Sequence, residues 1–263
     1  MISAVKRIVP KPLRRAVWNF LEGFPNPYTF RPRRYALSLV YAKRKRMGEL
    51  EAELHPDILQ QWVAKDKVAL DIGANIGCYS YALSKICRRV EAFEPNPIVA
   101  EVLQSHRASN IHVHNVGLSS LEGSLELHIP VVNGIPRYGC GSLSNEFGAS
   151  EKHFTVPVKR LDDFGFADIS FVKIDVEGHE AEVLKGGEAT IRRWMPTLLI
   201  EIEQRHTSCP VQEVFDILLV WGFKGHYLHE GRKHPISEFS VERHQTPFAP
   251  TDPRYINNFL FHP

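Results

Sequence analysis

The sequence predicts an α/β fold built on an open sheet that is covered by helices. An apolar run at residues 68–72 leads into a turn with two glycines and then into apolar residues at helical spacing. A second strand-like segment at 89–94 follows that helix, and it ends in an acidic residue, as the first carries Asp71 near its C-terminal end. Strand-like and helical segments then alternate over much of the chain to residue 228, which is the pattern of a sheet assembled from βα units.

Length and composition fit one large domain with an extension. The chain has 263 residues, of which 43% are hydrophobic and 24% charged, as in ordinary globular proteins. We expect a basic helical N-terminal extension at 1–60 and an α/β domain at 61–263. The α/β domain carries an insertion at about 122–160, where the alternation breaks down.

The extension carries most of the excess positive charge. Residues 1–50 hold 12 lysine and arginine residues against two acidic ones, although the net charge of the chain is only +2. One interpretation is a surface for an anionic membrane or a phosphate-bearing substrate. The other is a solubilised helical cap over the sheet edge. Nucleic acid is a less favoured partner, because aromatic residues do not alternate with the charges as stacking platforms would.

The cysteines and the hydropathy pattern favour a cytoplasmic protein. The four cysteines show neither a C-x-x-C pair nor a metal-ligand spacing, and no apolar run reaches the length of a membrane span. The N-terminus lacks the apolar core of a signal peptide. We expect a cytoplasmic location, with peripheral contact at the inner membrane surface through residues 1–50 as the alternative.

The turn after the first strand predicts a nucleoside site. Its pattern is D-x-G-x-N-x-G, formed by Asp71, Gly73, Asn75 and Gly77, and it differs from the G-x-G-x-x-G of dinucleotide sites. Glycines let the backbone approach a ligand closely, and Asp71 could face an ammonium group. A nucleoside that carries a charged amino-acid tail and no phosphate suits this pattern best.

The acid after the second strand predicts a ribose contact. Glu94 lies 21 residues after Gly73, where an acidic residue can accept hydrogen bonds from two ribose hydroxyls. The alternative is a solvated carboxylate at a strand end. The third strand, at 111–116, is followed by Gly117 and Leu118, which we place at the same sheet edge against a purine. His112 and His114 are interpreted as surface residues of this strand.

The insertion and the second half of the chain supply candidates for the chemistry. We expect extra strands at 124–129 and 154–158 around a lid on the substrate side, with Arg137 and Tyr138 as contacts and with Asp162 or Asp163 capping the next element. Further strands are expected at 171–174, 197–203, 222–228 and 255–261, with helices at 98–108, 180–191 and 214–221. Asp175, Glu177, Glu201 and Glu203 stand at the ends of two of these strands.

At these residues the sequence resembles the FkbM family of S-adenosylmethionine-dependent methyltransferases. The motifs that carry the resemblance span about 68–261 and run in this order: Asp71-Ile-Gly-Ala-Asn-Ile-Gly77, Phe93-Glu-Pro-Asn-Pro97, Gly117-Leu-Ser119, Leu161-Asp-Asp163, Val172-Lys-Ile-Asp-Val-Glu-Gly-His-Glu180, Val183-Leu-Lys-Gly186, Leu199-Ile-Glu201 and Asn258-Phe-Leu-Phe261.

The resemblance implies the class I methyltransferase fold, a Rossmann-like, mostly parallel sheet of seven strands in the order 3-2-1-4-5-7-6 with strand seven antiparallel. It implies S-adenosylmethionine as methyl donor and O-methylation of a sugar, glycolipid, polyketide or related metabolite. The donor's methionine end would lie against Asp71, Gly73, Asn75 and Gly77. Its ribose would lie against Glu94, and its adenosine against Asn96, Gly117 and Leu118.

An alcohol needs a base to become a good nucleophile, and three residues are candidates for base or substrate orienter. Asp175 comes first because strand four ends beside the donor's methyl group; Glu177 is second and His179 third. A divalent ion held by Asp175, Glu177 and Glu201 or Glu203 is a subsidiary hypothesis that we do not favour.

Three competing functions remain open at this stage. A nicotinamide-dependent oxidoreductase would use Glu94 but lacks its glycine fingerprint. An RNA methyltransferase would fit the basic extension, but the Asn/Asp-Pro-Pro-aromatic motif expected after strand four is missing. A non-catalytic nucleoside-binding or scaffold module is the third, because a fold does not fix a function.

Overall fold

The computed structural model describes residues 59–105, 108–144, 150–207, 209–229, 232–250, 252 and 254–263. Residues 1–58 of the predicted basic extension, and with them the predicted membrane contact through residues 1–50, lie outside the described residues. The sequence also predicts a short helix at 55–67, and its residues 55–58 lie outside the described residues as well. In the described part of the chain, no helix is both long enough and apolar enough to cross a membrane.

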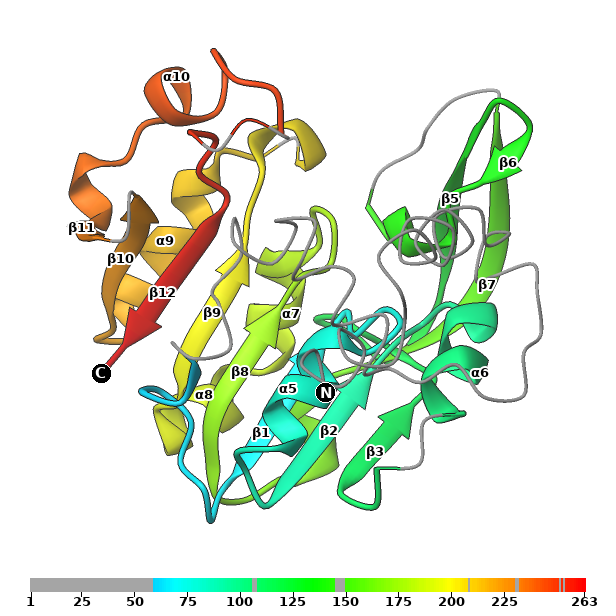
Figure 1. Cartoon of the computed structure of the whole chain (residues 1–263), viewed down its shortest axis with the longest axis horizontal. Coiled ribbons are helices and arrows are strands. Elements are labelled where there is room, and N and C mark those ends of the chain that lie inside the picture. The colour runs from blue at the N-terminus through cyan, green and yellow to red at the C-terminus, as the bar shows by residue number, and fades with distance from the viewer. Residues whose placement is uncertain are drawn as a thin grey trace, which may run out of the picture. The chain divides into compact units, whose positions relative to one another are not determined.

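The main sheet has eight strands in the order β11-β10-β12-β9-β8-β1-β2-β3 (Figure 1). Its strands are β1 (Val68–Ile72), β2 (Arg89–Phe93), β3 (Ile111–His114), β8 (Ile169–Ile174), β9 (Thr197–Glu201), β10 (Lys224–His229), β11 (Arg232–Pro235) and β12 (Asn258–His262). Strand β12 runs antiparallel to both β9 and β10. The class I order 3-2-1-4-5-7-6 is therefore present, but the expected count of seven is wrong because β11 adds an antiparallel edge strand beside β10.

The strand residues alternate between two apolar layers, one on each face of the sheet. The helices are α5 (Cys78–Ser84), α6 (Pro97–Gln104), α7 (Glu180–Gly186), α8 (Glu188–Trp194), α9 (Val211–Val220) and α10 (Val241–His244), with 3-10 turns η1 (Tyr138–Cys140), η2 (Leu161–Phe164), η3 (Gln204–His206) and η4 (Ile236–Glu238). Helices α7, α8 and α9 pack on one face against residues such as Leu70 and Val172. Helix α5 packs on the other against Ala69 and Phe171, and lies in front of the sheet in Figure 1.

The insertion contributes to a second sheet with the order β4-β7-β5-β6. Strands β5 (Gly123–Val132) and β7 (Glu151–Lys159) form a long antiparallel pair, which confirms and lengthens the two predicted extra strands. Strand β6 (Ile135–Pro136) folds back on the end of β5. Strand β4 (Gly117–Leu118) pairs with β7, so the expectation that Gly117 and Leu118 simply end the third main-sheet strand is wrong.

Two further expectations are corrected in the α7–α8 region. The single helix expected at 180–191 is divided at Gly187, where a side chain would collide with Leu161: a Cβ atom on Gly187 would lie 2.9 Å from Leu161 Cδ2. Asp162 does not cap its own turn η2. Its two carboxylate oxygens accept hydrogen bonds from the amides of Ala189 and Thr190, and so they cap the first turn of α8.

Candidate active site

The glycine turn after β1 is shaped by close contact with its neighbours. Gly73, Asn75 and Gly77 have positive φ angles of 78°, 51° and 85°. A Cβ atom on Gly73 would lie 1.7 Å from the carbonyl oxygen of Asp175, so only glycine lets the turn pass the end of β8. The amide of Gly73 donates to the Phe93 carbonyl at 3.0 Å and fixes the turn against β2.

Glu94 is buried where β2 ends, and both of its oxygens face this turn. They accept hydrogen bonds from the amides of Asn75 and Asn96, each at 2.8 Å. Burial raises the pKa of Glu94 to about 7, with these amide hydrogen bonds opposing the shift and the charges of Asp71 and Asp175 adding to it. A buried carboxylate held in this way is a preformed acceptor for paired hydroxyl groups.

A pocket opens at the carboxyl ends of β1, β2 and β8. Its volume is about 620 Å³, including the solvent at its mouth. Six residues predicted to hold the donor line it, together with two of the predicted catalytic residues and one predicted lid residue: Gly73, Asn75, Glu94, Asn96, Gly117, Leu118, Asp175, Glu177 and Tyr138. Although β4 belongs to another sheet than expected, it still brings Gly117 and Leu118 to this pocket.

Three other predicted contacts do not line the pocket. Asp71 is only 1% exposed and accepts a hydrogen bond from the Ser80 hydroxyl in α5, so it faces the helix and not the pocket. Gly77 is the N-cap residue of α5. Arg137 precedes η1 without reaching the pocket wall, whereas its neighbour Tyr138 forms part of that wall.

The segment Arg137–Gly141 is fastened across the pocket by two side-chain amides. Asn75 Nδ2 donates to the Gly139 carbonyl at 3.0 Å, and Asn96 Nδ2 donates to the Tyr138 carbonyl at 3.1 Å. Asn75 and Asn96 therefore both line the pocket and hold the insertion in place. One residue beyond the segment, the Ser142 hydroxyl donates to the Glu177 carbonyl at 2.7 Å.

Asp175 lies in a charged cluster at the end of β8. The buried ammonium of Lys173 is 3.7 Å from Asp175 Oδ2 and 3.6 Å from Glu201 Oε2. Lys173 Nζ also lies 5.1 Å from the centroid of the Tyr79 ring. Because a cation of the chain already stands between Asp175 and Glu201, the arrangement favours an orienting hydrogen-bond acceptor over a metal ligand.

Glu177 is held in an unusual backbone conformation beside a histidine. Its φ angle is 54°, and its Oε2 lies 2.7 Å from His206 Nδ1. Burial alone would lower the pKa of His206, but the hydrogen bond and charge of Glu177 outweigh burial and raise it above its ordinary value. We did not identify His206 from the sequence, because η3 joins the site through a contact between residues far apart in the chain. The run of polar residues at 203–206 is the only local signal.

His179, the third base candidate, lies behind the pocket wall. It is buried, with Ser144 Oγ 2.6 Å from Nδ1 and Ser119 Oγ 3.0 Å from Nε2. Burial lowers the pKa of His179, which favours the neutral ring. With both ring nitrogens engaged by hydroxyl groups, His179 connects α7 to the insertion and is poorly placed to take a proton from a substrate.

Glu203 also has partners within the chain. It forms an ion pair with Arg205 and accepts a hydrogen bond from the Tyr255 hydroxyl at 2.8 Å. Burial would raise the pKa of Glu203, but these two hydrogen bonds hold it below its ordinary value. Since Asp175, Glu201, Glu177 and Glu203 each have a partner within the chain in Lys173, His206 or Arg205, the subsidiary hypothesis of a divalent ion at these carboxylates is not carried further.

A protein-family model matches the part of the chain that holds the pocket. The methyltransferase FkbM domain matches residues 71–224, which are more than half of the chain. The matched region runs from the glycine turn to the start of β10. It therefore contains the pocket and the insertion.

Curated relatives carry methyltransferase names. The 2-O-methyltransferase NoeI of Sinorhizobium fredii is 23% identical over 205 residues, covering 68% of this chain and 82% of the relative. The hexuronic acid methyltransferase AglP of Haloferax volcanii is 35% identical and covers 49% of this chain and 53% of the relative. The methyltransferase sdnD of Sordaria araneosa is 31% identical over 44% of this chain and 59% of the relative. Two of these matches thus span less than two thirds of the relative's length.

Among solved structures, the methyltransferase FkbM from Methylobacillus flagellatus KT aligns with a TM-score of 0.49 at 18% identity, over 81% of this chain and 52% of that one.

Proposed function

We propose that this chain, which belongs to the FkbM family of methyltransferases, transfers a methyl group from S-adenosylmethionine to a hydroxyl group of a sugar or related metabolite. The observation that carries the proposal is the pocket itself. A nucleoside-type half with Glu94 and the glycine turn adjoins a polar half with Asp175 and Glu177. Residues that would bind the donor and residues that would remove the proton therefore lie on adjacent walls of one pocket.

The residues of the first half fit S-adenosylmethionine. Glu94 offers a buried carboxylate for the ribose hydroxyls, and Leu118 offers an apolar surface for the adenine. Gly73 and Asn75 present backbone close to where the methionine end would lie. When bound, S-adenosylmethionine supplies a methyl group already activated by its sulfonium, so the chain's own work is alignment and proton removal.

The residues of the second half fit the acceptor. We assign Asp175 to accept the proton of the acceptor hydroxyl, with Lys173 holding its carboxylate in place. Glu177 orients the acceptor, and its own position is fixed by His206 and by the left-handed turn at residues 177 and 178. His179 supports the wall from behind through its two serine contacts.

The acceptor class is supported by the relatives' names. One relative is named as a 2-O-methyltransferase and another as a hexuronic acid methyltransferase. A pocket wall of carboxylates and amides suits an acceptor rich in hydroxyl groups, since each can accept from or donate to a sugar. Sugars and glycans are therefore the first acceptors to test.

The proposal is tested by separating donor binding from methyl transfer. Calorimetry should show saturable binding of S-adenosylmethionine and S-adenosylhomocysteine and none of NAD. Transfer of a labelled methyl group to a panel of uronic acids and neutral glycans should then be lowered about 100-fold by Asp175→Asn, with S-adenosylhomocysteine affinity unchanged. Absence of binding of either sulfur nucleoside would remove the proposal's basis. Methyl transfer that Asp175→Asn leaves intact would remove the role of Asp175.

A further inference from the structure

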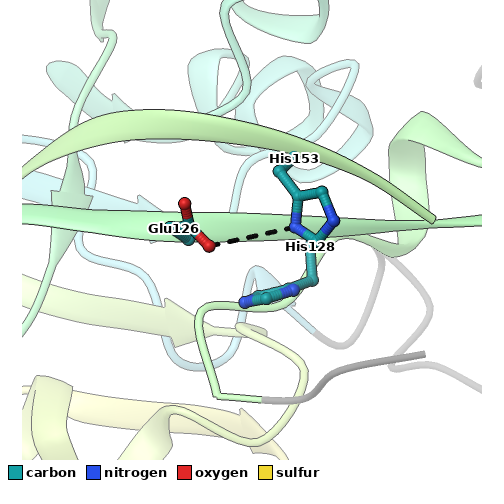
Figure 2. Close-up of side chains that lie close together, drawn as sticks. All are labelled: Glu126, His128 and His153. Atoms are coloured by element: carbon teal, nitrogen blue, oxygen red, sulfur yellow. Dashed lines mark ion pairs between the residues drawn. The ribbon is translucent and has the colours of Figure 1, made fainter. Parts of the chain in front are cut away.

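A second cluster of polar side chains lies on the β5–β7 pair, apart from the pocket. Glu126 and His128 come from β5 and His153 from β7, and the strand register places His128 directly opposite His153. Figure 2 shows the three side chains close together on the two strands. Because side chains alternate along a strand, the neighbouring Leu127 points the other way, into the pocket wall.

The ligand atoms of this cluster are already close together. One side-chain nitrogen or oxygen from each of Glu126, His128 and His153 lies within 4.8 Å of the others. The distance from His153 Nδ1 to Glu126 Oε2 is 4.0 Å, the dashed line of Figure 2. The rings of His128 and His153 meet at 81°, with their centroids 4.9 Å apart.

A fourth residue orients both histidines from behind. Glu151 Oε1 lies 3.4 Å from His128 Nδ1 and 3.5 Å from His153 Nε2. Its side chain is only 10% exposed, whereas that of Glu126 is 64% exposed. A carboxylate that accepts from one ring nitrogen of a histidine commonly fixes the other nitrogen for a metal.

We propose that Glu126, His128 and His153 bind one divalent transition-metal ion, of the class of Zn²⁺, with Glu151 positioning the two histidines. Two imidazoles and one carboxylate form a three-ligand set that Zn²⁺ accepts, with solvent as the fourth ligand. A hard cation such as Mg²⁺ would not favour the imidazoles. This proposal does not depend on the methyl-transfer reaction.

Metal binding here would need only small side-chain movements. Ligand atoms around a tetrahedral Zn²⁺ lie about 3.3 Å apart, given Zn–N and Zn–O distances of roughly 2.0–2.1 Å. The exposed side chains of Glu126 and His153 have the freedom to close that difference. The strands themselves are already paired in register and need not move.

The ion would join β5 to β7 behind the pocket. His128 also exchanges backbone hydrogen bonds with Ser142, at 2.9 and 3.0 Å. The Ser142 hydroxyl in turn donates a hydrogen bond to the Glu177 carbonyl. A metal on His128 would therefore brace the strand that carries Leu127 and the segment that covers Asn75 and Asn96. An ion held here would stabilise the insertion.

The test is a titration of the full chain, freed of metal and lacking any histidine tag, with Zn²⁺ and separately with Mg²⁺. We expect one Zn²⁺ per chain with micromolar affinity and no binding of Mg²⁺ under the same conditions. At a hundredfold excess over Kd, Zn²⁺ should raise Tm by roughly 5–10 °C. His153→Asn and Glu126→Gln, both at exposed positions, should each weaken binding at least tenfold.

The matched control is another pair of histidines on the same molecule. His226 and His262 stack at 5.1 Å on the main sheet without belonging to this cluster, so His262→Asn should leave Zn²⁺ affinity unchanged. An equal loss of Zn²⁺ affinity in His262→Asn and His153→Asn would contradict the assignment. So would absence of saturable Zn²⁺ binding, or binding that survives both cluster variants.

Discussion

At the scale of single residues, the role proposed for Glu94 predicts that donor binding depends on pH. Ribose hydroxyls donate hydrogen bonds, so the carboxylate must be ionised to accept both of them. Its pKa is raised to about 7, so it binds a proton as pH falls below that value. We predict that S-adenosylhomocysteine binds roughly tenfold more weakly at pH 6 than at pH 8, measured by calorimetry.

The matched control for this prediction is Glu180, another buried acid whose pKa burial raises to about 7 but which does not line the pocket. Glu94→Gln should weaken binding at pH 8 by at least tenfold and abolish the pH dependence. Glu180→Gln should retain the pH dependence. If S-adenosylhomocysteine affinity still depends on pH in Glu94→Gln, the group that titrates is not Glu94.

A second prediction concerns His206, which contacts Glu177 from η3. His206 holds the carboxylate of Glu177, which we propose orients the acceptor, and it has no proposed contact with the donor. We therefore expect His206→Asn to lower kcat/KM for the acceptor at least tenfold. The affinity for S-adenosylhomocysteine should stay within twofold of the original. Steady-state kinetics and calorimetry on one preparation would check both, and a loss confined to donor affinity would contradict the assignment.

Residue identities were predictable where the chemistry is local, and orientations were not. Glu94 and Gly73 could be picked out because a strand end followed by a turn leaves few other arrangements. Asp71 belongs to the same motif, yet the pleat turns it toward Ser80 in α5. The Glu177–His206 pair depends on how two separate loops pack, which no spacing along the chain reveals.

At the scale of elements, the segment Arg137–Gly141 depends on tight packing against β5. A Cβ atom on Gly141 would lie 2.6 Å from Ile129 Cδ1 and 3.3 Å from Leu127 Cδ1. We predict that the larger side chain in Gly141→Val pushes the segment away from β5 and loosens the hydrogen bonds that Asn75 and Asn96 donate to it. The affinity for S-adenosylhomocysteine should then change at least fivefold.

The control is Lys152→Ala, at an exposed position on the partner strand β7, which should leave that affinity unchanged. Hydrogen exchange of the 137–142 amides reports the packing directly. Unaltered exchange in Gly141→Val would show that the segment does not rest on β5 as described.

Elements with apolar alternation were predictable, and elements defined by their partner were not. The pair β5 and β7 could be predicted from its own residues. Strand β11 is Arg-Lys-His-Pro and has no apolar pattern, because it only covers the edge of β10. Strand β4 has two residues, and its change of sheet is decided by its pairing with β7.

At the scale of the whole molecule, the last strand holds the far half of the sheet together. Phe259 and Phe261 of β12 are fully buried against Phe215 of α9. We predict that Phe259→Ala lowers the free energy of unfolding by about 3–5 kcal/mol, measured by urea denaturation. Val220→Ala, at a side chain that is 84% exposed, should change it by less than about 0.5 kcal/mol.

The strand order lay beyond what periodicity can give. Alternating strands and helices predict a covered sheet, but only the family resemblance supplied the order 3-2-1-4-5-7-6 and the antiparallel seventh strand. Such an order is fixed by contacts between residues far apart, for example Phe259 beside Ile200. The secondary-structure propensity of a segment carries no information about contacts of this kind.

The interior position of β12 also has a consequence for biosynthesis. Strands β9 and β10 precede β12 in the chain, yet it lies between them and pairs with both. While a ribosome is still making residues up to 257, β9 and β10 each have an unpaired edge, and such edges invite pairing with another nascent chain. Synthesis is therefore a stage at which this half of the sheet is open to such pairing.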